Sequence, residues 1–227
     1  MSKRLLIYCE GQTELMFTER LLRNHLAMHG VKVERPILAA TSLEPAGQRG
    51  GFVNWNAIEF DLSQEFASDS DPNLRFTTLL DVFRMPKAVP GMGAINGPLT
   101  TVPDIESVER AIEGIFNEAR FKAYLQRHEF EALLLSDIGA LGRIFYRDAD
   151  GIQQLERDIA PFANAEEINH GAETHPAARL ASAIIGYEDL KASNAYFVLA
   201  EAGLPSARAR CPRFDKWLTH WETWGAQ

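Results

Sequence analysis

The sequence predicts an α/β fold in which helices flank a doubly wound, mainly parallel sheet, with a helical region added on the C-terminal side. Three observations predict it. In the first half of the chain, short apolar runs alternate with longer segments of helical periodicity. Two of these runs end in an acidic residue, Glu10 and Asp81, and the second half shows helical patterns without a convincing strand. We therefore expect an α/β domain over residues 1–137 and a helical region packed on it over residues 138–227.

Four apolar runs are predicted to form the strands of the sheet. They are 4–9, 33–40 with Pro36 as an irregularity, 75–81 and 121–126. Three helices are predicted between them, because apolar residues recur there at helical spacing. They run over 13–29 with Gly30 as the C-cap, from the N-cap Asn54 to Phe66, and from Asp104 to Ile115.

Two glycine-rich loops interrupt this pattern. The first, 41–51, lacks a Walker lysine motif and is therefore not a P-loop. The second, 86–98, follows Asp81 directly, so it borders any site that forms at the end of that strand. Beyond it, the helical region is predicted to contain helices near 152–162, 180–185, 195–202 and 214–224.

The composition is typical of a globular protein without a membrane segment. Of the 227 residues, 46% are apolar and 24% are charged, which suits a packed core. No apolar run approaches the ~18 residues of a transmembrane helix, and Glu10 ends the first run too early for a signal peptide. Cys9 and Cys211 lie far apart and are predicted to be reduced thiols, so we expect a cytoplasmic protein that does not contact a membrane.

The net charge of −8 and the pI near 5.3 argue against binding of nucleic acid by bulk electrostatics alone. A basic segment near the C-terminal end still allows two interpretations. It contains Arg208, Arg210, Arg213 and Lys216, interleaved with Phe214, Trp217, Trp221 and Trp224. Either these side chains bind a nucleic-acid backbone, or they form a solvated helix face whose aromatic residues pack in the core. We favour the second interpretation.

The strongest candidates for chemistry are Glu10 and Asp81, at the C-terminal ends of two predicted strands. Ligands bind at that edge of open α/β sheets, and two carboxylates there suit Mg²⁺ or Mn²⁺. Simpler interpretations exist. Glu10 could be a negative charge that the start of the next helix favours, and Asp81 could be a turn residue. Glu14, in the first helical turn, is explained equally well by the helix dipole and by metal ligation.

Five further residues near these strand ends are candidates for supporting roles. Arg84 and Lys87 either hold a phosphate near the metal or are solvated loop charges. His128 is a candidate acid or base. Glu129 is a candidate third metal ligand, and the role of Glu131 stays open. The alternative interpretation of the segment that contains His128, Glu129 and Glu131 is a capped helix with an exposed acidic face.

Four ordered motifs connect the sequence with a known group of proteins. They are EGQTE at 10–14, TTLLD at 77–81, HEFEALLLSD at 128–137 and GLPSARARCPRFDKWL at 203–218. Together they resemble a Toprim-related bacterial family of unknown function. The first two motifs and the strand order are similar to the Toprim domains of topoisomerases, DnaG-type primases and OLD-family nucleases. The resemblance spans most of the chain.

The resemblance implies a Toprim-like fold with a Mg²⁺ site, in which Glu10 is the acid/base or a ligand and Asp81 is a ligand. It also implies a role in phage defence beside an ATPase subunit. One departure matters, because Toprim domains usually carry Asp-x-Asp, whereas Phe83 stands two residues after Asp81. Either a glutamate at 14, 129 or 131 replaces the missing carboxylate, or catalysis has been lost.

We therefore expect a Mg²⁺-dependent phosphodiester hydrolase acting on DNA, RNA or a nucleotide. The metal would activate water, Glu10 would assist proton transfer, and Arg84 or Lys87 would stabilise charge in the transition state. Two alternatives stay open. One is a non-catalytic Toprim-like subunit that binds a partner ATPase or a nucleotide. The other is a scaffold whose tryptophan-rich C-terminal face docks a partner.

Overall fold

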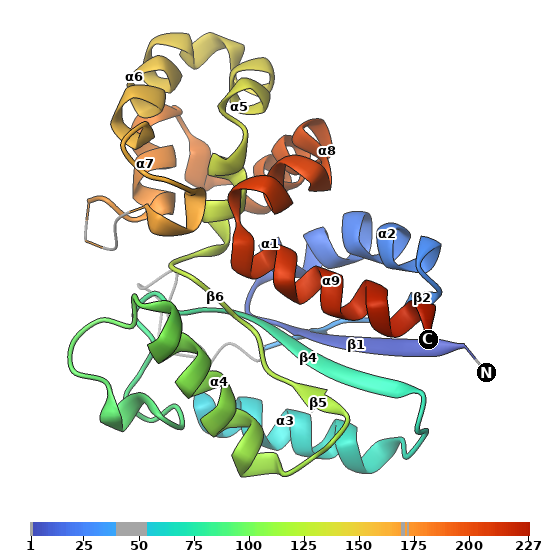
Figure 1. Cartoon of the computed structure of the whole chain (residues 1–227). Coiled ribbons are helices and arrows are strands. Elements are labelled where there is room, and N and C mark those ends of the chain that lie inside the picture. Colours follow the sequence, from blue (N-terminus) through green and yellow to red (C-terminus); the bar gives the residue numbers. More distant parts are fainter. Residues whose placement is uncertain (1, 40–53, 169–170, 172) are drawn as a thin grey trace.

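The computed structural model describes residues 2–39, 54–168, 171 and 173–227, so the glycine-rich loop 41–51 lies outside the described residues. Its centre is a sheet of six short strands (Figure 1). They are β1 (Lys3–Cys9), β2 (Val31–Val33), β3 (Ile37–Leu38), β4 (Leu74–Asp81), β5 (Phe121–Lys122) and β6 (Leu125–Gln126). The order is β2-β1-β4-β5, with β3 also paired to β1 and β6 to β4, and every one of these pairings is parallel. The predicted mainly parallel sheet is confirmed.

The central pair of strands, β1 and β4, positions the acidic residues. Their register runs from Arg4 opposite Leu74 to Cys9 opposite Leu79. Both strands are buried over most of their length, as expected for parallel strands covered on both faces. Because the two strands run in the same direction and end together, they bring their C-terminal residues to one edge of the sheet.

Two predicted strands are each divided in the structure. The run 33–40 was predicted as one strand, but its described part, 33–39, contains only the last residue of β2, which begins at Val31, and the separate strand β3. The two are separated around Pro36, which has no N–H for a ladder. The run 121–126 is divided into β5 and β6 at Tyr124. There, Thr78 Oγ1 donates to the Tyr124 carbonyl at 2.8 Å and accepts from the Tyr124 N–H at 2.9 Å. The Thr78 side chain thus takes the place of two backbone hydrogen bonds of the sheet.

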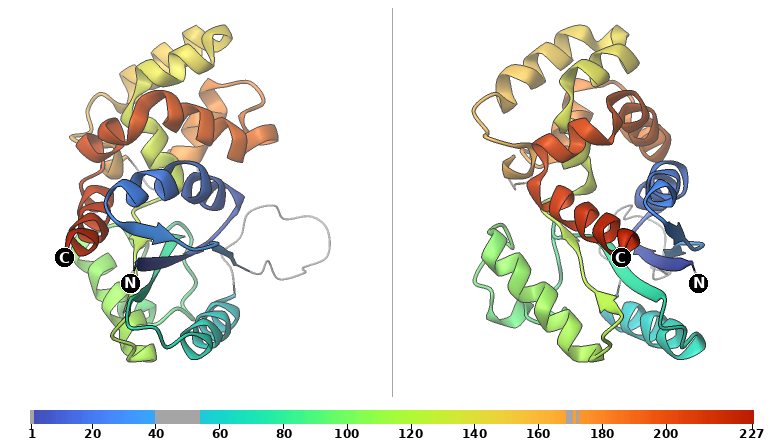
Figure 2. Two further views of the ribbon diagram at one scale, coloured as in Figure 1. Left: turned by 90° about the vertical axis from the view of Figure 1, so that its right-hand side faces the viewer. Right: turned by 45° about the vertical axis from the view of Figure 1, so that its right-hand side comes forward.

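Helices cover both faces of the sheet (Figures 1 and 2). One face carries α1 (Gln12–Phe17), a π-helical turn (Thr18–Leu22), α2 (Arg23–Met28) and α9 (Pro212–Ala226); the other carries α3 (Trp55–Ser68) and α4 (Val102–Phe116). Side chains of β1 alternate between the two cores, so Leu5 and Ile7 join the first and Leu6 and Tyr8 the second.

The predicted helix starts are largely confirmed. The side chain of Asn54 accepts a hydrogen bond from the Asn56 N–H and caps α3. The start of α4 lies two residues earlier than predicted. Thr101 is its N-cap, because the Thr101 hydroxyl accepts from the Asp104 N–H and a proline is tolerated in the first turn.

The edge of the sheet formed by β5 and β6 is closed by α4. The N–H groups of Ala123 and Leu125 point away from β4, and each finds a carboxylate acceptor on the helix. Glu113 accepts from Ala123 at 3.0 Å and Glu109 accepts from Leu125 at 2.9 Å. Arg213 of α9 in turn binds Glu109 at 2.6 Å, so α4, the edge strands and α9 share one polar network.

As predicted, the described part of residues 138–227 contains helices joined by turns and no strand. The second half of the chain contains a 3₁₀ segment (Phe130–Ser136), α5 (Ile138–Ile144), α6 (Ala149–Ile159), α7 (Pro176–Ala183), α8 (Lys191–Arg210) and α9. Gly203, with φ 75°, bends α8 near the predicted helix end. Helices α5 to α8 form a lobe at the top of Figure 1, whereas α9 returns to the sheet, where Trp217 Nε1 donates to Thr77 Oγ1 at 3.1 Å. The C-terminal helix therefore shares the core of the α/β domain.

Within the described residues, no helix has both the length and the apolar character needed to cross a membrane. Cys9 and Cys211 are free and buried, in agreement with the predicted reduced thiols.

Candidate metal centre

Glu10 and Asp81 meet at the C-terminal edge of the sheet, as predicted. Asp81 is the last residue of β4 and Glu10 follows β1 directly. Glu10 Oε2 accepts a hydrogen bond of 2.7 Å from the backbone N–H of Asp81. Both residues keep part of their surface open to solvent. The two neighbouring parallel strands thus hold the two carboxyl groups at one place on this edge of the sheet.

Two further glutamates complete a group that we call the acidic cluster, Glu10, Glu14, Asp81 and Glu131. Glu14 lies in the first turn of α1, and its carboxylate accepts from the Gly11 N–H at 2.9 Å. This contact supports the helix-start interpretation of Glu14. Glu131, in the 3₁₀ segment, is 1% exposed and forms an ion pair of 2.8 Å with Lys191. The sequence left Glu131 open and gave no signal for Lys191, which the start of α8 delivers from the helical lobe.

The electrostatics of the acidic cluster favour protonation or a bound cation. Burial, and then repulsion from Glu14, raises the pKa of Glu10 to about 8. Burial also raises the pKa of Glu14 to about 7. For Asp81, burial and then repulsion from Glu10 raise the pKa well above its ordinary value. Shifts of this kind mark groups that are held close together against their mutual repulsion.

A divalent cation fits the donor set of this cluster. Its ligands would be carboxylate oxygens, which are the donors that Mg²⁺ and Mn²⁺ prefer. Asp81 Oδ1 is buried and has no hydrogen-bond partner, so it is a donor atom ready for an ion. The arrangement is more open than a closed ligand shell. Among the described residues, three His, Cys, Asp or Glu ligand atoms within 4.8 Å of one another occur at His25, His29 and Glu222. The carboxylates of the acidic cluster would therefore move together around an ion.

Glu129 lies beside the cluster and is held by α7. Its Oε2 accepts from the Ala177 N–H at 2.9 Å and pairs with His175 Nδ1 at 2.7 Å. Burial and then Glu131 raise its pKa. Phe83, the residue at the missing aspartate position, stacks on the His175 ring with centroids 4.4 Å apart. These contacts direct Glu129 towards α7, whereas Glu131 is among the groups whose charge raises the pKa of Asp81.

The predicted supporting residues have different surroundings. Arg84 is exposed with φ 56°, and its guanidinium lies 5.0 Å from the Phe83 ring. Lys87 Nζ donates to the carbonyls of Met92 and Ile95, so it ties the proline- and glycine-rich loop together. His128 is 2% exposed and has φ 65°. Arg84 is thus free to reach a ligand in solution, Lys87 has a structural task, and the predicted chemical roles of all three stay predictions.

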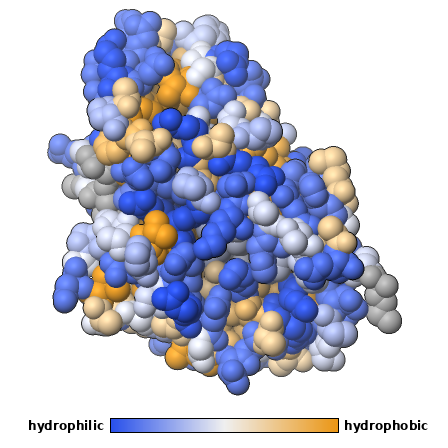
Figure 3. Space-filling view, in the orientation of Figure 1, coloured by the Kyte–Doolittle hydropathy of each residue, from blue (hydrophilic) through white to orange (hydrophobic). Residues whose placement is uncertain are grey.

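The basic C-terminal segment follows the interpretation favoured from the sequence. Arg208 pairs with Asp215 and Glu222, and Lys216 pairs with Glu106 at 3.1 Å. The aromatic side chains of α9 pack inward: Trp217 is 2% exposed and Trp221 is 1% exposed. The face of the molecule seen in Figure 3 is predominantly hydrophilic. Trp217 and Trp221 are core residues, whereas Trp224 is half-buried, and the hypothesis that this face docks a partner stays a prediction.

Comparison with known proteins gives a family without an assigned activity. Residues 9–222 match the model of the family described as a domain of unknown function (DUF4276). Searches of the curated proteins and of the solved structures return no match to the chain.

Proposed function

The chain belongs to the DUF4276 family, and we propose that it is a metal-dependent phosphodiester hydrolase of Toprim type that acts on nucleic acid. The observation that carries this proposal is the acidic cluster. Two adjacent parallel strands end at Glu10 and Asp81, the charges of Glu14 and Glu131 raise the pKa of Asp81, and Lys191 forms an ion pair with Glu131. Four carboxyl groups, of which one is paired with a lysine, repel one another when ionised, and a divalent ion would balance this charge.

The donors for Mg²⁺ or Mn²⁺ would be Glu10, Asp81 and Glu131, with Glu14 and Glu129 as the remaining predicted ligands. Such an ion supplies an activated water and stabilises charge on the phosphate. Glu10 is suited to proton transfer, because its pKa of about 8 lies close to neutral pH. Lys191 would stabilise negative charge on the reacting phosphate from inside the site, and Arg84 would do so from the exposed loop.

A second candidate function is a non-catalytic subunit that binds a partner ATPase or a nucleotide. Two observations favour it: Phe83 packs on His175 where Toprim domains usually keep an aspartate, and the cluster is more open than a closed metal shell. Under either function, action in phage defence beside an ATPase is the biological setting that the sequence resemblance implies.

Cleavage assays separate the two candidates. The substrates would be supercoiled DNA, single-stranded DNA and tRNA, each with Mg²⁺ and with Mn²⁺. Glu10→Gln keeps an acceptor for the Asp81 N–H, so it should remove cleavage without unfolding the protein. Asp81→Asn should also remove cleavage, whereas Glu156→Gln, an exposed residue of α6, should leave it unchanged.

Cleavage that persists in both cluster variants would rule out the acidic cluster as the active site. If wild type cleaves no substrate with either metal, alone or with an ATPase encoded beside it, the result favours the non-catalytic subunit. Binding of that ATPase to wild type and to Asp81→Asn with equal affinity would support the same conclusion.

A further inference from the structure

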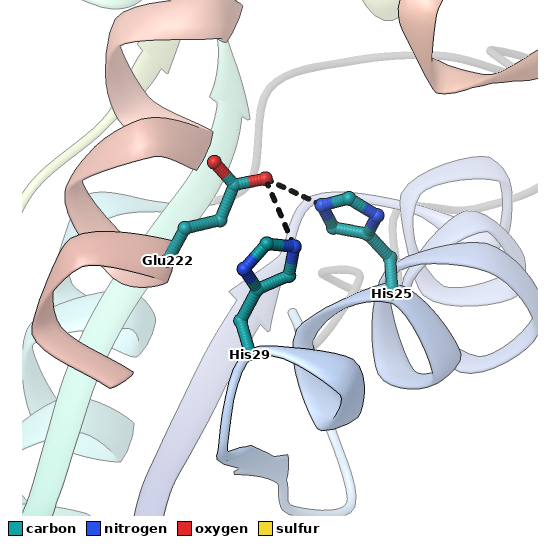
Figure 4. A group of neighbouring side chains, drawn as sticks. All are labelled: His25, His29 and Glu222. Carbon is teal, nitrogen blue, oxygen red and sulfur yellow. Dashed lines mark hydrogen bonds and ion pairs between the residues drawn. The ribbon is translucent and has the colours of Figure 1, made fainter. Parts of the chain in front are cut away.

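A second group of metal-ligating side chains lies far from the acidic cluster, where α2 meets α9. Figure 4 shows His25, His29 and Glu222 pointing toward one another. His25 Nε2 lies 2.5 Å from Glu222 Oε1, and His29 Nε2 lies 3.8 Å from the same oxygen. One ligand atom from each residue falls within 4.8 Å of the other two. We propose that these three residues form a binding site for a divalent transition-metal ion of the Zn²⁺ class.

The local sequence explains the arrangement of the two histidines. His25 belongs to α2, and His29 is the residue at which α2 ends. Residues four apart lie on the same face of a helix, one turn above the other. The two rings accordingly lie side by side, with centroids 4.9 Å apart. Two histidines at this spacing can bind one ion together, as they do in zinc-binding helices.

The third ligand comes from the other end of the chain and is held rigidly in place. Glu222 of α9 is separated from His25 by 197 residues. Helix α9 packs closely against the end of α2 at Gly225, where an added Cβ would lie 2.0 Å from the His29 carbonyl oxygen. The backbones of α2 and α9 are therefore in direct contact beside the site, and the helix positions that carry the three ligands are set before any ion binds.

The geometry suits Zn²⁺ better than Mg²⁺. Zn²⁺ binds nitrogen and oxygen ligands at about 2.0–2.2 Å in tetrahedral geometry, which places the ligand atoms about 3.3 Å apart. The two distances to Glu222 Oε1 lie on either side of this value, so small side-chain rotations would bring all three atoms onto one ion. Imidazole nitrogen favours zinc and its neighbours, whereas Mg²⁺ requires oxygen. The His29 side chain is 41% exposed, which leaves a path for the ion and for a water as the fourth ligand.

Arg208 would compete with a metal ion for the Glu222 carboxylate. Its Nη1 donates to Glu222 Oε1 at 2.6 Å and its Nη2 donates to Oε2 at 3.1 Å. An ion on Oε1 would displace the first of these bonds and could keep the second, which then orients the carboxylate. The positive charge of Arg208 weakens cation binding, so Arg208→Gln should bind Zn²⁺ more tightly than wild type.

Titration of Zn²⁺ by calorimetry, with Co²⁺ absorption as a second readout, tests the proposal. Wild type should bind one Zn²⁺ at this site, and His25→Gln, His29→Gln and Glu222→Gln should each weaken binding tenfold or more. His220→Gln removes another histidine of α9, two residues from Glu222 and outside the group, and should bind as wild type does. Asp81→Asn should also retain Zn²⁺ binding, which separates this site from the acidic cluster.

Thermal unfolding gives an independent measurement. An ion that binds the folded state raises the melting temperature, and a given Zn²⁺ concentration should therefore raise it more in wild type than in His29→Gln. Because the His29 side chain is exposed, we expect His29→Gln to fold even if His25→Gln or Glu222→Gln does not. Equal Zn²⁺ affinity in wild type and His29→Gln, or no Zn²⁺ binding to wild type at micromolar concentrations, would overturn the proposal.

Discussion

Glu10 and Asp81 are joined by a hydrogen bond between the side chain of the first and the main chain of the second, at 2.7 Å. The bond links the ends of β1 and β4 and fixes the Glu10 carboxyl group. It leaves the Asp81 carboxylate out of the contact, and Asp81 Oδ1 is buried without a hydrogen-bond partner. The two residues therefore differ. The Glu10 carboxyl group is held in place by the backbone of β4, whereas the Asp81 carboxylate keeps an oxygen available for an ion.

Substitution of Asp81 should reduce metal binding at the acidic cluster. Asp81→Asn removes the charge of the donor atom that lacks a partner, so we expect Mn²⁺ affinity to fall at least about tenfold, or about 1.4 kcal/mol. Calorimetric titration of Mn²⁺ measures this change, with Glu156→Gln as the control. Equal affinity of wild type and Asp81→Asn would exclude Asp81 as a ligand.

The raised pKa of Glu10 links stability to pH. In the unfolded chain the carboxyl group loses its proton near its ordinary pKa of 4.5, whereas in the folded protein it keeps the proton until about pH 8. Between these values the unfolded state binds fewer protons, so the contribution of this group to the free energy of unfolding falls as pH rises.

Urea denaturation of the metal-free protein at pH 5.5 and pH 8 measures the effect. Wild type should lose more stability over this interval than Glu10→Gln, because glutamine does not titrate. A loss of the same size in both proteins would contradict the assignment of the shift to Glu10.

Removal of the lysine charge should destabilise the protein and strengthen metal binding. Lys191→Met keeps the aliphatic stem but leaves Glu131, which is 1% exposed, without its ion pair. We expect a loss of about 2 kcal/mol, below the full cost of a broken buried pair because the Lys191 side chain is 36% exposed. Chemical denaturation with Lys122→Met, an exposed lysine of β5, as control checks this value. A variant as stable as wild type would contradict a stabilising role of the ion pair between Lys191 and Glu131.

Glu166 caps α9 from a distant segment, and its loss should weaken the packing of that helix. Its two carboxylate oxygens accept from the N–H groups of Arg213 and Phe214 at 2.8 Å and 3.1 Å. Glu166→Ala leaves both donors buried without partners, for which we expect a loss of about 1–3 kcal/mol. The neighbouring Glu167→Ala, at an exposed position, should change stability by about 0.5 kcal/mol or less. Comparable melting temperatures for the two variants would contradict the capping role.

The sequence predicts well those features that depend on local pattern. An apolar run followed by an acidic residue is a local signal, so the strand ends at Glu10 and Asp81 could be located and their common edge inferred. The division of the last predicted strand could not be foreseen, because it depends on Thr78, a residue of another strand, bonding to Tyr124.

The remaining members of both candidate sites depend on tertiary contacts. Lys191 reaches Glu131 because α8 begins beside the 3₁₀ segment, and nothing in its own neighbourhood indicates this. The group of His25, His29 and Glu222 likewise forms only when α9 returns to α2 across 197 residues. Two histidines four residues apart were visible in the sequence, but the carboxylate that completes the group was not.

The closure of the β5–β6 edge by Glu109 and Glu113 has a consequence for assembly. An open edge strand invites another chain to continue the sheet, which is a common route to both dimers and aggregates. Here a strand of another chain would first have to displace the carboxylates of Glu109 and Glu113 from the N–H groups of Leu125 and Ala123. The displaced carboxylates would then lack these hydrogen bonds. Strand addition is therefore blocked at this border, and any protein that associates with it must use side chains of α4 and α9.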